Sequence, residues 1–400
     1  MAKKHTHYFF LSDNYDKSHR RNIVDALYPL LKEWSTLVVV SAPISLIFHT
    51  LINFKKIIRL VKGVFKTYET DDGKIIFTPI ILFHYIYWLK FGLFAKVDEW
   101  LIIYQLKSLG KKYNISFSNN ILYVFYPHLY PIIKNKFFQT RIYEFYDNHS
   151  YDYDGNIIEK MNVYNKKLMQ ESDIVICTAK VLYEQSKILN INSFYIPNGN
   201  DYKLLSNKDN IEIVPDLEII NKSIIGYIGM IRNWIDFELM KYLMKNLPDS
   251  LFVFIGGIEK NAIHLMKELE SFPNCRRYGQ MAREQLKSYM TYFDVGLIPF
   301  RVNKFTEGVY PLKFNEYIAT QIPVVTTALP DLEEYSDYIG YSRTYEEFLL
   351  NCKQAIKGDF GIKVKHYDEI AYNNSWEKKA EMLNKILINN LGIDINKIEY

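Results

Sequence analysis

The chain has 400 residues, of which 48% are hydrophobic and 24% are charged, and its formal net charge at pH 7 is +4. This composition excludes an intrinsically disordered protein, and the length allows two domains with separate cores. Three cysteines lie far apart without metal or redox spacing, which excludes a disulfide framework and a zinc site and is typical of a reducing compartment.

The N-terminal region begins with short apolar runs but does not read as a signal peptide, because Asp13 and Asp16 interrupt the first one. Residues 7–11 and 36–41 are predicted as buried strands, and residues 21–32 between them have helical periodicity. The longest apolar run, residues 75–89, has 15 residues and contains a proline. A membrane-spanning helix needs roughly 20 residues, so a buried strand followed by a core helix is predicted there.

Further apolar runs ending in Pro, Asn, Asp or Gly alternate with helical patterns along the rest of the N-terminal half: KIIFTP, ILYVFYP, RIYEFYD, DIVICTA and SFYIPNG. Residues 201–222 are polar and contain a proline, which indicates a linker. A second alternation follows, and residues from Trp376 form an amphipathic pattern typical of a terminal helix.

The sequence therefore predicts an α/β protein with two Rossmann-like, doubly wound domains. The predicted boundaries are residues 1–200 for the first domain, 201–222 for the linker, 223–375 for the second domain and 376–400 for the terminal helix. Ligands of such sheets bind at the carboxyl ends of the strands, so the residues that directly follow strands are the candidates for a site.

The loop after the strand GYIG is one such place. Gly229 allows a tight turn, Arg232 carries a planar donor fork that suits a diphosphate, and Asp236 opens the next helix. A solvated arginine on a capped turn is the alternative interpretation.

The second place is TEGVYPLKFNEYIATQIPVVTT, residues 306–327. Lys313 and Glu316 are three residues apart and therefore share one face of the first helical turn. A lysine beside a helix N-terminus can hold a phosphate, and a carboxylate can accept both vicinal hydroxyls of a ribose. An ordinary i,i+3 ion pair is the alternative, but lysine favours the opposite helix end when it serves stability.

The run LIPFRVNKFTEGVYPLKFNEYIATQIPVVTTALPDL resembles the nucleotide-sugar motif of GT-B glycosyltransferases, in particular the family-4-like bacterial enzymes of teichuronic acid and other surface-polysaccharide synthesis. The resemblance extends to GYIGMIRNWIDFELMKYL, SDIVICTAKVLYEQ, YIPNGND and SWEKKAEML. It implies two Rossmann-like domains that face each other across a cleft, with the C-terminal helix crossing back to pack on the N-terminal domain. It also implies that residues 1–200 form the acceptor-binding domain and residues 223–375 the nucleotide-sugar-binding domain.

By position, the resemblance implies that Glu316 binds the donor ribose and that Lys313 and Arg232 hold the diphosphate. It also implies that backbone N–H groups near residues 309–312 face the sugar or its phosphate. The other donor-binding candidates are Gly229, Glu307, Val309, Tyr310 and Leu312. The chain departs from the family pattern at two points. Eight residues separate Glu307 from Glu316 where the family has seven, and Ser12, Asp13 and Asn14 replace the usual glycine-rich loop after the first strand.

In the N-terminal half, FYDNHSYDYDG follows a predicted strand, so the polar residues of this turn are expected at the site: Asp147, Asn148, His149 and Asp152. The resemblance implies that His149 contacts the donor sugar; a turn rich in Asx caps is the alternative. The motif SHRRN places His19, Arg20 and Arg21 on a helix start, where they would suit an anionic acceptor.

Positive charge is concentrated in the N-terminal part. Residues 1–66 have a net charge of +7 and the remaining residues one of −3. Residues 44–66 carry five Lys and Arg and no acid, and Lys55, Arg59, Lys62 and Lys66 recur at helical spacing. This pattern favours binding to an anionic membrane surface, and an ordinary surface helix is the alternative. Nucleic acid is not an expected partner, because no recognition motif accompanies the charge.

The resulting hypothesis is a metal-independent hexosyltransferase without a cofactor, which moves a sugar from a nucleotide donor, UDP-linked, to a glycan or lipid-linked acceptor in cell-surface polysaccharide synthesis. Retention of anomeric configuration is implied by the resemblance; inversion with Asp147 or His149 as base stays open. A sugar-nucleotide epimerase of the same fold and a non-catalytic nucleotide-sugar-binding protein also stay open. The expected location is the cytoplasm, with attachment to the inner membrane face left open.

Overall fold

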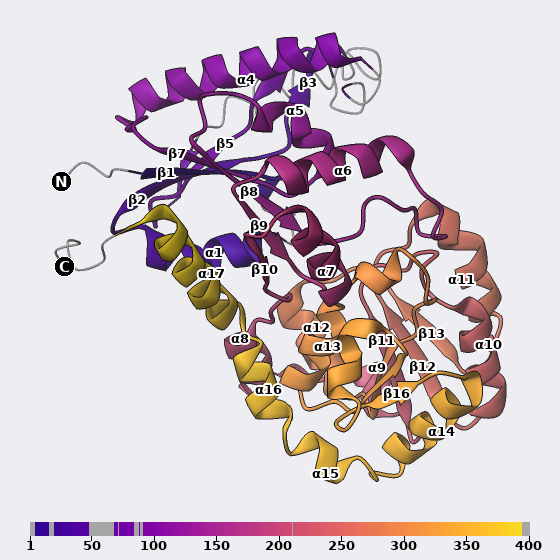
Figure 1. Ribbon diagram of the computed structural model, residues 1–400. Coiled ribbons are helices and arrows are strands. Elements are labelled where there is room, and N and C mark those ends of the chain that lie inside the picture. The colour runs from indigo at the N-terminus through magenta and orange to yellow at the C-terminus, as the bar shows by residue number, and fades with distance from the viewer. Residues whose placement is uncertain are drawn as a thin grey trace. The chain divides into compact units, whose positions relative to one another are not determined.

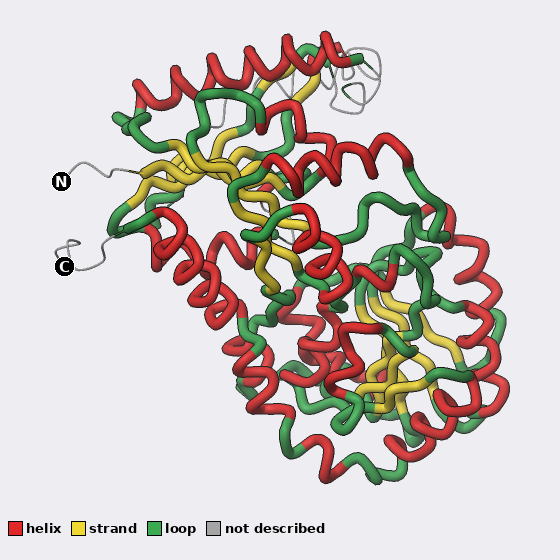
Figure 2. Tube along the Cα trace, in the orientation of Figure 1, coloured by secondary structure: helices red, strands yellow, loops and turns green. Residues whose placement is uncertain are grey.

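The computed structural model describes residues 5–15, 20–47, 68–70, 72–83, 88, 91–209 and 211–393 (Figures 1 and 2). The chain forms two compact units. The first comprises Met1–Ser150, Ile157–Ile196 and Lys379–Tyr400, and the second comprises Tyr151–Asn156 and Pro197–Lys378.

The first unit is built on an eight-stranded sheet whose strands are parallel except for β4, which is antiparallel to β5. Its order places the first strand in the middle and runs outward in both directions, as in a doubly wound sheet. In spatial order the strands are β10 (Ser193–Tyr195), β9 (Ile174–Cys177), β8 (Thr140–Phe145), β7 (Asn120–Val124), β1 (His5–Phe10), β2 (Ser35–Val40), β5 (Ile75–Phe77) and β4 (Tyr68–Glu69). A separate parallel pair joins β3 (Ile44–Ser45) to β6 (Ile80–Ile81).

Helices pack on this sheet because each buries one apolar stripe. In α1 the buried side chains include Ile23, Val24, Leu27 and Leu31, which recur at helical spacing. The helices that contribute to this unit are α1 (Arg21–Leu31), α4 (Gly92–Lys112), α5 (Tyr130–Ile133), α6 (Glu159–Glu171), α7 (Lys180–Leu189) and most of α17 (Trp376–Leu391). A 3-10 turn, η3 (Pro127–Leu129), precedes α5.

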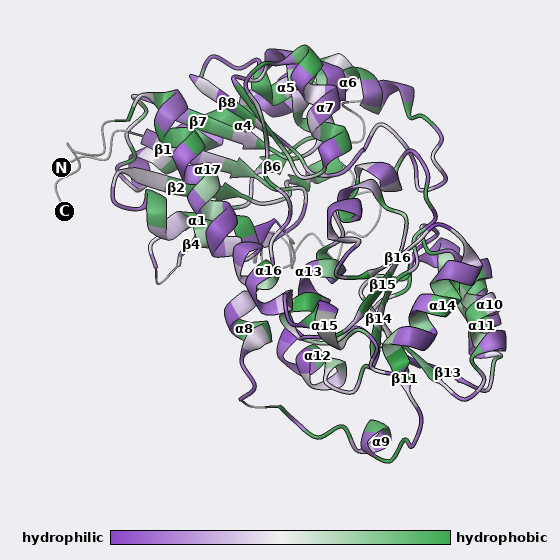
Figure 3. Cartoon of the chain, turned by 60° about the horizontal axis from the view of Figure 1, so that its bottom comes forward, coloured by the Kyte–Doolittle hydropathy of each residue, from purple (hydrophilic) through white to green (hydrophobic). Residues whose placement is uncertain are grey.

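The second unit contains a six-stranded sheet that is parallel throughout. The strand order reverses between β11 and β14, which is the point where doubly wound sheets bind ligands. In spatial order the strands are β13 (Cys275–Tyr278), β12 (Leu251–Ile255), β11 (Ile224–Ile228), β14 (Val295–Ile298), β15 (Val324–Thr327) and β16 (Gly340–Ser342). Figure 3 shows hydrophobic residues concentrated on strands such as β14 and β15, which are buried between helices.

Two helix starts of the second unit follow the sequence rules closely. Asp236 caps α10, accepting a hydrogen bond from the N–H of Leu239 (2.9 Å), and α13 begins directly after Pro311. The helices of the unit are α8 (Tyr202–Ser206), α9 (Pro215–Glu218), α10 (Phe237–Asn246), α11 (Ile263–Glu270), α12 (Arg283–Met290), α13 (Leu312–Ala319), α14 (Tyr345–Ile356), α15 (Gly361–Val364) and α16 (Tyr367–Asn373). Short 3-10 turns are η4 (Lys260–Ala262), η5 (Thr306–Gly308) and η6 (Pro330–Tyr335).

The prediction of an α/β protein with doubly wound parallel sheets is confirmed, and every strand predicted by its apolar run is present. The end of the run 75–89, predicted as a core helix, falls mostly outside the described residues. The stretch predicted as a linker, residues 201–222, contains α8 and α9 and belongs to the second unit. Apolar side chains explain this difference, since Leu217 of α9 is buried against the core of that unit.

Candidate functional site

The loop after β11 turns at Gly229, where φ is +105°, a conformation that residues with a side chain rarely adopt. The Gly229 N–H donates to the carbonyl oxygen of Ile255 at the end of β12 (2.8 Å). A methyl group added to Gly256 would come within 2.1 Å of the Gly229 carbonyl oxygen. The two glycines therefore let the ends of β11 and β12 pack backbone against backbone.

Lys313 reaches from the first turn of α13 to this Gly229 turn. A methyl group added to Gly229 would lie 2.8 Å from Lys313 Nζ, so the ammonium group rests directly on the glycine. The same nitrogen lies 5.0 Å from the centre of the Tyr227 ring and 5.3 Å from that of Phe300. In the described part of the chain, no carboxylate lies within ion-pair distance of it. A cation is thus held against two aromatic faces.

This environment lowers the pKa of the Lys313 ammonium group. Burial lowers the pKa of Lys313 to about 8; the carboxylate of Glu316 opposes this shift and the guanidinium group of Arg232 adds to it. A desolvated ammonium group without a carboxylate partner is a ready site for an anion, since an anion would supply the missing counter-charge.

Arg232 lies on the same loop, three residues after Gly229. Its guanidinium carbon is 4.9 Å from the centre of the Trp234 ring and 5.5 Å from that of Tyr153. Its Nε is 3.8 Å from a carboxylate oxygen of Glu259, too far for a hydrogen bond. That Nε is buried, and no described residue accepts a hydrogen bond from it. Arg232 is therefore held by ring faces while part of its donor capacity stays unused.

Tyr153 is a part of this site that the sequence did not reveal. It belongs to the short segment 151–156, which folds with the second unit although the residues on either side of it belong to the first. Its ring packs edge-on against Trp234 (5.2 Å between ring centres) and Phe305 (5.0 Å). Because the ring also faces Arg232, Tyr153 helps to fix the guanidinium group.

Hydrogen bonds and an ion pair hold segment 151–156 in place. The Tyr153 carbonyl oxygen accepts hydrogen bonds from Arg301 Nη2 (3.3 Å) and Asn303 Nδ2 (3.0 Å), and Arg301 also pairs with the Asp154 carboxylate (2.7 Å). The sequence predicts a turn here, but it gives no local signal for partners about 150 residues away. Asp152 accepts hydrogen bonds from the N–H groups of Asp154 and Asn156, so the Asx-turn alternative holds for that residue.

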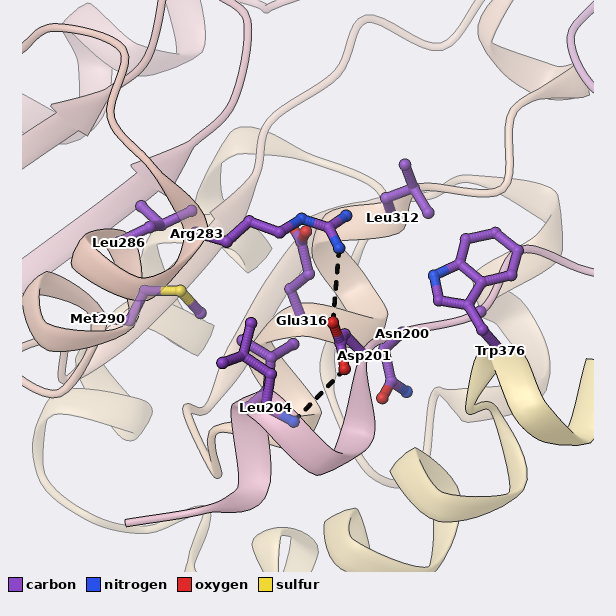
Figure 4. A pocket seen from close by; sticks show the side chains of 11 residues that line it. Asn200, Asp201, Leu204, Arg283, Leu286, Met290, Leu312, Glu316 and Trp376 are labelled. Carbon is purple, nitrogen blue, oxygen red and sulfur yellow. Dashed lines mark hydrogen bonds and ion pairs between the residues drawn. The ribbon is translucent and has the colours of Figure 1, made fainter. Parts of the chain in front are cut away.

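Glu316 lies one turn after Lys313 and lines a separate pocket of the second unit (Figure 4). Arg283, from the first turn of α12, lines the same pocket (Figure 4). Arg283 Nη1 is 3.8 Å from an oxygen of Asp201, and Trp376 contributes an indole wall. Leucine and methionine side chains complete the lining. The pocket thus combines flat, apolar and charged surfaces.

The remaining donor-binding candidates lie between η5 and α13. Glu307 belongs to η5 and its carboxylate accepts from Lys304 Nζ (2.9 Å). The Val309 N–H donates to the carbonyl oxygen of Thr306 (3.1 Å), so it is already used within the turn, which differs from the expectation that it faces the donor. Leu312 lines the pocket with Glu316.

Tyr310 is buried and has a structural role in the start of α13. Its carbonyl oxygen accepts from Asn198 Nδ2 (2.9 Å), and Asn315 Nδ2 donates to the carbonyl oxygen of Asn198 (2.6 Å). These two amide bonds anchor the helix that carries Lys313 and Glu316, since buried amides without partners would be unfavourable.

In the first unit, Asp147 and His149 follow β8 as predicted. The His149 ring stacks on Tyr126 (4.4 Å between ring centres) and meets Tyr146 edge-on (5.0 Å), and its Nε2 is buried without a hydrogen-bond partner among the described residues. Burial lowers the pKa of His149 to about 3, with the positive charge of Arg20 contributing. The imidazole is therefore neutral at physiological pH and far too weak a base for proton abstraction there.

The basic helix start SHRRN differs from its expected role. Arg20 is 3% exposed and forms an ion pair with Glu144, which is itself buried in β8, and Arg21 pairs with Asp25 (2.9 Å). A buried carboxylate needs a counter-charge, which explains why Arg20 turns inward instead of toward an acceptor. His19 lies outside the described residues.

Most of the basic segment 44–66 also lies outside the described residues, apart from its first four positions. Within the residues that the structure describes, no helix is long and apolar enough to cross a membrane. Among those same residues, no group of three or more His, Cys, Asp and Glu side chains could hold a metal ion.

No protein-family model matches the chain. A teichuronic acid biosynthesis glycosyltransferase of Bacillus subtilis, TuaH, is 29% identical over 172 residues, which cover 41% of this chain and 42% of that protein. The chain therefore matches less than half the length of this relative.

Solved structures with the same fold align over nearly the whole chain. Sucrose-phosphate synthase of Thermosynechococcus elongatus has a TM-score of 0.73 at 12% identity and covers 98% of this chain and 100% of its own. HepE of Anabaena, solved in complex with UDP, has a TM-score of 0.65 at 11% identity over 96% of this chain and 100% of its own. The predicted GT-B fold and the resemblance to surface-polysaccharide glycosyltransferases are confirmed.

Proposed function

We propose that this GT-B protein is a glycosyltransferase that moves a hexose from a UDP-sugar to a glycan or lipid-linked acceptor in cell-surface polysaccharide synthesis. The observation that carries the proposal is the Lys313 ammonium group, which rests on the Gly229 turn with no carboxylate of the described residues within ion-pair distance. The name of the Bacillus subtilis relative and the UDP and UDP-glucose complexes of HepE support the class of acceptor and of donor.

In this proposal the donor diphosphate binds at the turn after β11. Lys313 supplies one positive charge and Arg232 supplies a second, with its unused Nε hydrogen available as a donor. Bond cleavage at the anomeric carbon leaves negative charge on the diphosphate, and fixed positive groups stabilise charge that grows in the transition state. Loss of either group should lower turnover by about 100- to 1,000-fold.

Glu316 binds the nucleoside part of the donor. Its carboxylate lies in a pocket that offers the Trp376 indole and aliphatic side chains, which suit a flat base and a sugar ring. A carboxylate can accept hydrogen bonds from both ribose hydroxyls, each of which is worth about 1.5–3 kcal/mol when the acceptor is charged. Glu307, which pairs with Lys304, is assigned no contact with the base or the diphosphate.

The proposed stereochemical outcome is retention, which the family resemblance implies. The lowered pKa of His149 supports this choice over inversion with His149 as base, because a neutral imidazole of pKa about 3 is poorly suited to take a proton near pH 7. Inversion with Asp147 as base is the competing route. The proposed location of the reaction is the cytoplasmic side of the membrane, where nucleotide sugars are donors.

The test is to incubate the purified protein with several UDP-sugars, with and without membrane extract, and to measure UDP release and the anomeric configuration of the product. Acceptor-dependent UDP release supports the proposal. Interconversion of sugars without an acceptor would identify an epimerase, and tight donor binding without turnover would identify a non-catalytic binding protein. Unchanged donor binding in Lys313→Ala and Glu316→Ala variants would contradict the site assignment.

A further inference from the structure

The helix α4 has an exposed face that the proposed reaction does not use. It is 21 residues long, which corresponds to about 31 Å, and Figure 1 shows it along the outer edge of the first unit. One side of the helix is buried against that unit through residues such as Ile102, Leu106 and Leu109. The other side bears large apolar side chains: Leu93 is 70% exposed, and Trp100 and Tyr104 are each 64% exposed.

These exposed side chains form one continuous stripe. Positions 93, 96, 100, 104, 107 and 111 follow one another at intervals of three or four residues, so they share one face of the helix. The rings of Trp100 and Tyr104 stack with their centres 5.8 Å apart. We refer to this surface as the α4 face, defined by Leu93, Lys96, Trp100, Tyr104, Lys107 and Lys111.

The charge on the α4 face is of one sign. Lys96, Lys107 and Lys111 are exposed, whereas the two acidic residues of the helix are engaged elsewhere. Asp98 is fully buried and accepts hydrogen bonds from the Leu82 N–H (2.7 Å) and from Trp88 Nε1 (2.8 Å). Asn135 Nδ2 donates to a Glu99 oxygen (2.7 Å). The charged side chains that define the α4 face are therefore all lysines, and Glu99, which interacts electrostatically with Lys96, lies outside the stripe.

The α4 face continues into further apolar surface at the N-terminal end of the helix. Phe91 is 51% exposed and lies 5.1 Å from Phe94, measured between ring centres, and Phe94 stacks on Phe83 (3.8 Å). Beside Phe83, the carbonyl oxygen of Leu82 accepts from the N–H of Ile47, which is 40% exposed. The surface thus reaches Ile47, two residues after the end of β3.

We propose that the α4 face is a docking surface for an anionic phospholipid bilayer. A stacked Trp and Tyr pair is amphipathic and suits the headgroup level of a membrane, where Leu93 and Phe91 would reach the acyl chains. The lysines at either side have stems long enough to keep their charges among the headgroups. A straight helical stripe of one charge matches a flat, negatively charged plane.

The test uses the purified full chain with vesicles of phosphatidylglycerol and phosphatidylcholine, compared with vesicles of phosphatidylcholine alone. Flotation should require the anionic lipid and should weaken as salt rises. Brominated lipid should quench tryptophan fluorescence, because Trp100 is 64% exposed whereas Trp34, Trp88 and Trp376 are buried. Trp234 is half-buried and belongs to the second unit, whereas α4 belongs to the first, and it should contribute little to the quenching. That quenching should be lost in Trp100→Phe.

Two variants localise the binding. Lys107→Glu with Lys111→Glu should weaken partitioning by at least about 25-fold, since each lysine near an anionic surface contributes about fivefold. Trp100→Ser with Tyr104→Ser should abolish flotation. The control is Ile188→Ser with Ile191→Ser, which removes two apolar side chains of the same unit that are 84% and 88% exposed.

Three results would overturn the inference: no binding to anionic vesicles, wild-type binding by both α4 variants, or binding lost equally in the control. Binding retained by both α4 variants would assign the membrane contact to another surface. Concentration-dependent self-association that the α4 variants abolish, without any vesicle binding, would identify the face as an interface between copies of the chain. Each α4 variant is checked for an unchanged thermal unfolding midpoint and unchanged UDP binding, so that a folding defect is recognised.

Discussion

Replacing Lys313 with Met should make the protein more stable and less able to bind its donor. Met keeps the length of the side chain and can fill the space against Tyr227 and Phe300, but it carries no charge. A pKa lowered from 10.5 to about 8 corresponds to roughly 3 kcal/mol by which the charged form destabilises the folded state. The variant should therefore gain about 1–3 kcal/mol in free energy of unfolding at pH 7.

The pH dependence provides an internal check on this reasoning. Because the folded pKa of Lys313 lies below the unfolded one, the destabilisation is full below pH 8, fades as the pH rises, and is gone above pH 10.5. The difference in free energy of unfolding between variant and wild type should fall to about 1 kcal/mol at pH 9.5. Urea unfolding at pH 7 and pH 9.5 measures it, with Lys267→Met on the exposed face of α11 as the control.

The reasoning is refuted if Lys313→Met unfolds at a lower urea concentration than the wild type at pH 7. That result would mean that the ammonium group already makes stabilising contacts in the folded protein and does not need an anion as its counter-charge. UDP binding, measured by calorimetry on the same samples, should weaken by at least about 100-fold, since the variant removes a charge that we propose faces the diphosphate.

Three further substitutions test the neighbours of Lys313. Gly229→Ala should weaken UDP binding and lower the free energy of unfolding by about 1–3 kcal/mol, because the added methyl group would lie 2.8 Å from Lys313 Nζ on a strained backbone. Calorimetry measures the binding and urea unfolding the stability, and unchanged values would contradict the packing. Tyr153→Ala should lower kcat/KM for the donor by about 5- to 10-fold, because Arg232 loses a ring that orders it, whereas Tyr153→Phe should keep kcat/KM near the wild-type value. An equal loss in both variants would assign the effect to the hydroxyl group. Glu316→Gln should lose most of the preference for UDP over 2′-deoxy-UDP in competition assays, and a preserved preference would exclude Glu316 from the ribose site.

The sheet architecture and much of the site could be predicted because they depend on local patterns. Apolar runs ending in Pro or Gly located the strands, and the rule that parallel strands bind ligands at their carboxyl ends brought the Gly229 loop and the start of α13 together. The proximity of Lys313 to Gly229 follows from that rule and from the position of the lysine on the first turn of its helix.

Contacts between distant parts of the chain could not be predicted in this way. Tyr153 and Arg301 are separated by nearly 150 residues, and the hydrophobic periodicity around each residue does not predict that the two are in contact. Arg20 reads as a surface cation from its sequence context, and only the burial of Glu144 in β8 explains its inward position. The Val309 N–H was expected to be available, but a 3-10 turn, which a run of four residues does not specify, already uses it.

The insertion of residues 151–156 into the second unit limits how the chain can be divided. A fragment that begins at residue 197 would contain both the sheet and the loop of the proposed donor site but would lack Tyr153. One side of Arg232 and the faces of Trp234 and Phe305 would then be open to water. The same holds for chimeras that join the N-terminal half of one relative to the C-terminal half of another. In such a chimera, the segment that packs on Arg232 would come from a different protein than Arg232 itself. An exchange of the proposed donor site between relatives therefore requires that residues 151–156 and the C-terminal half are transferred together.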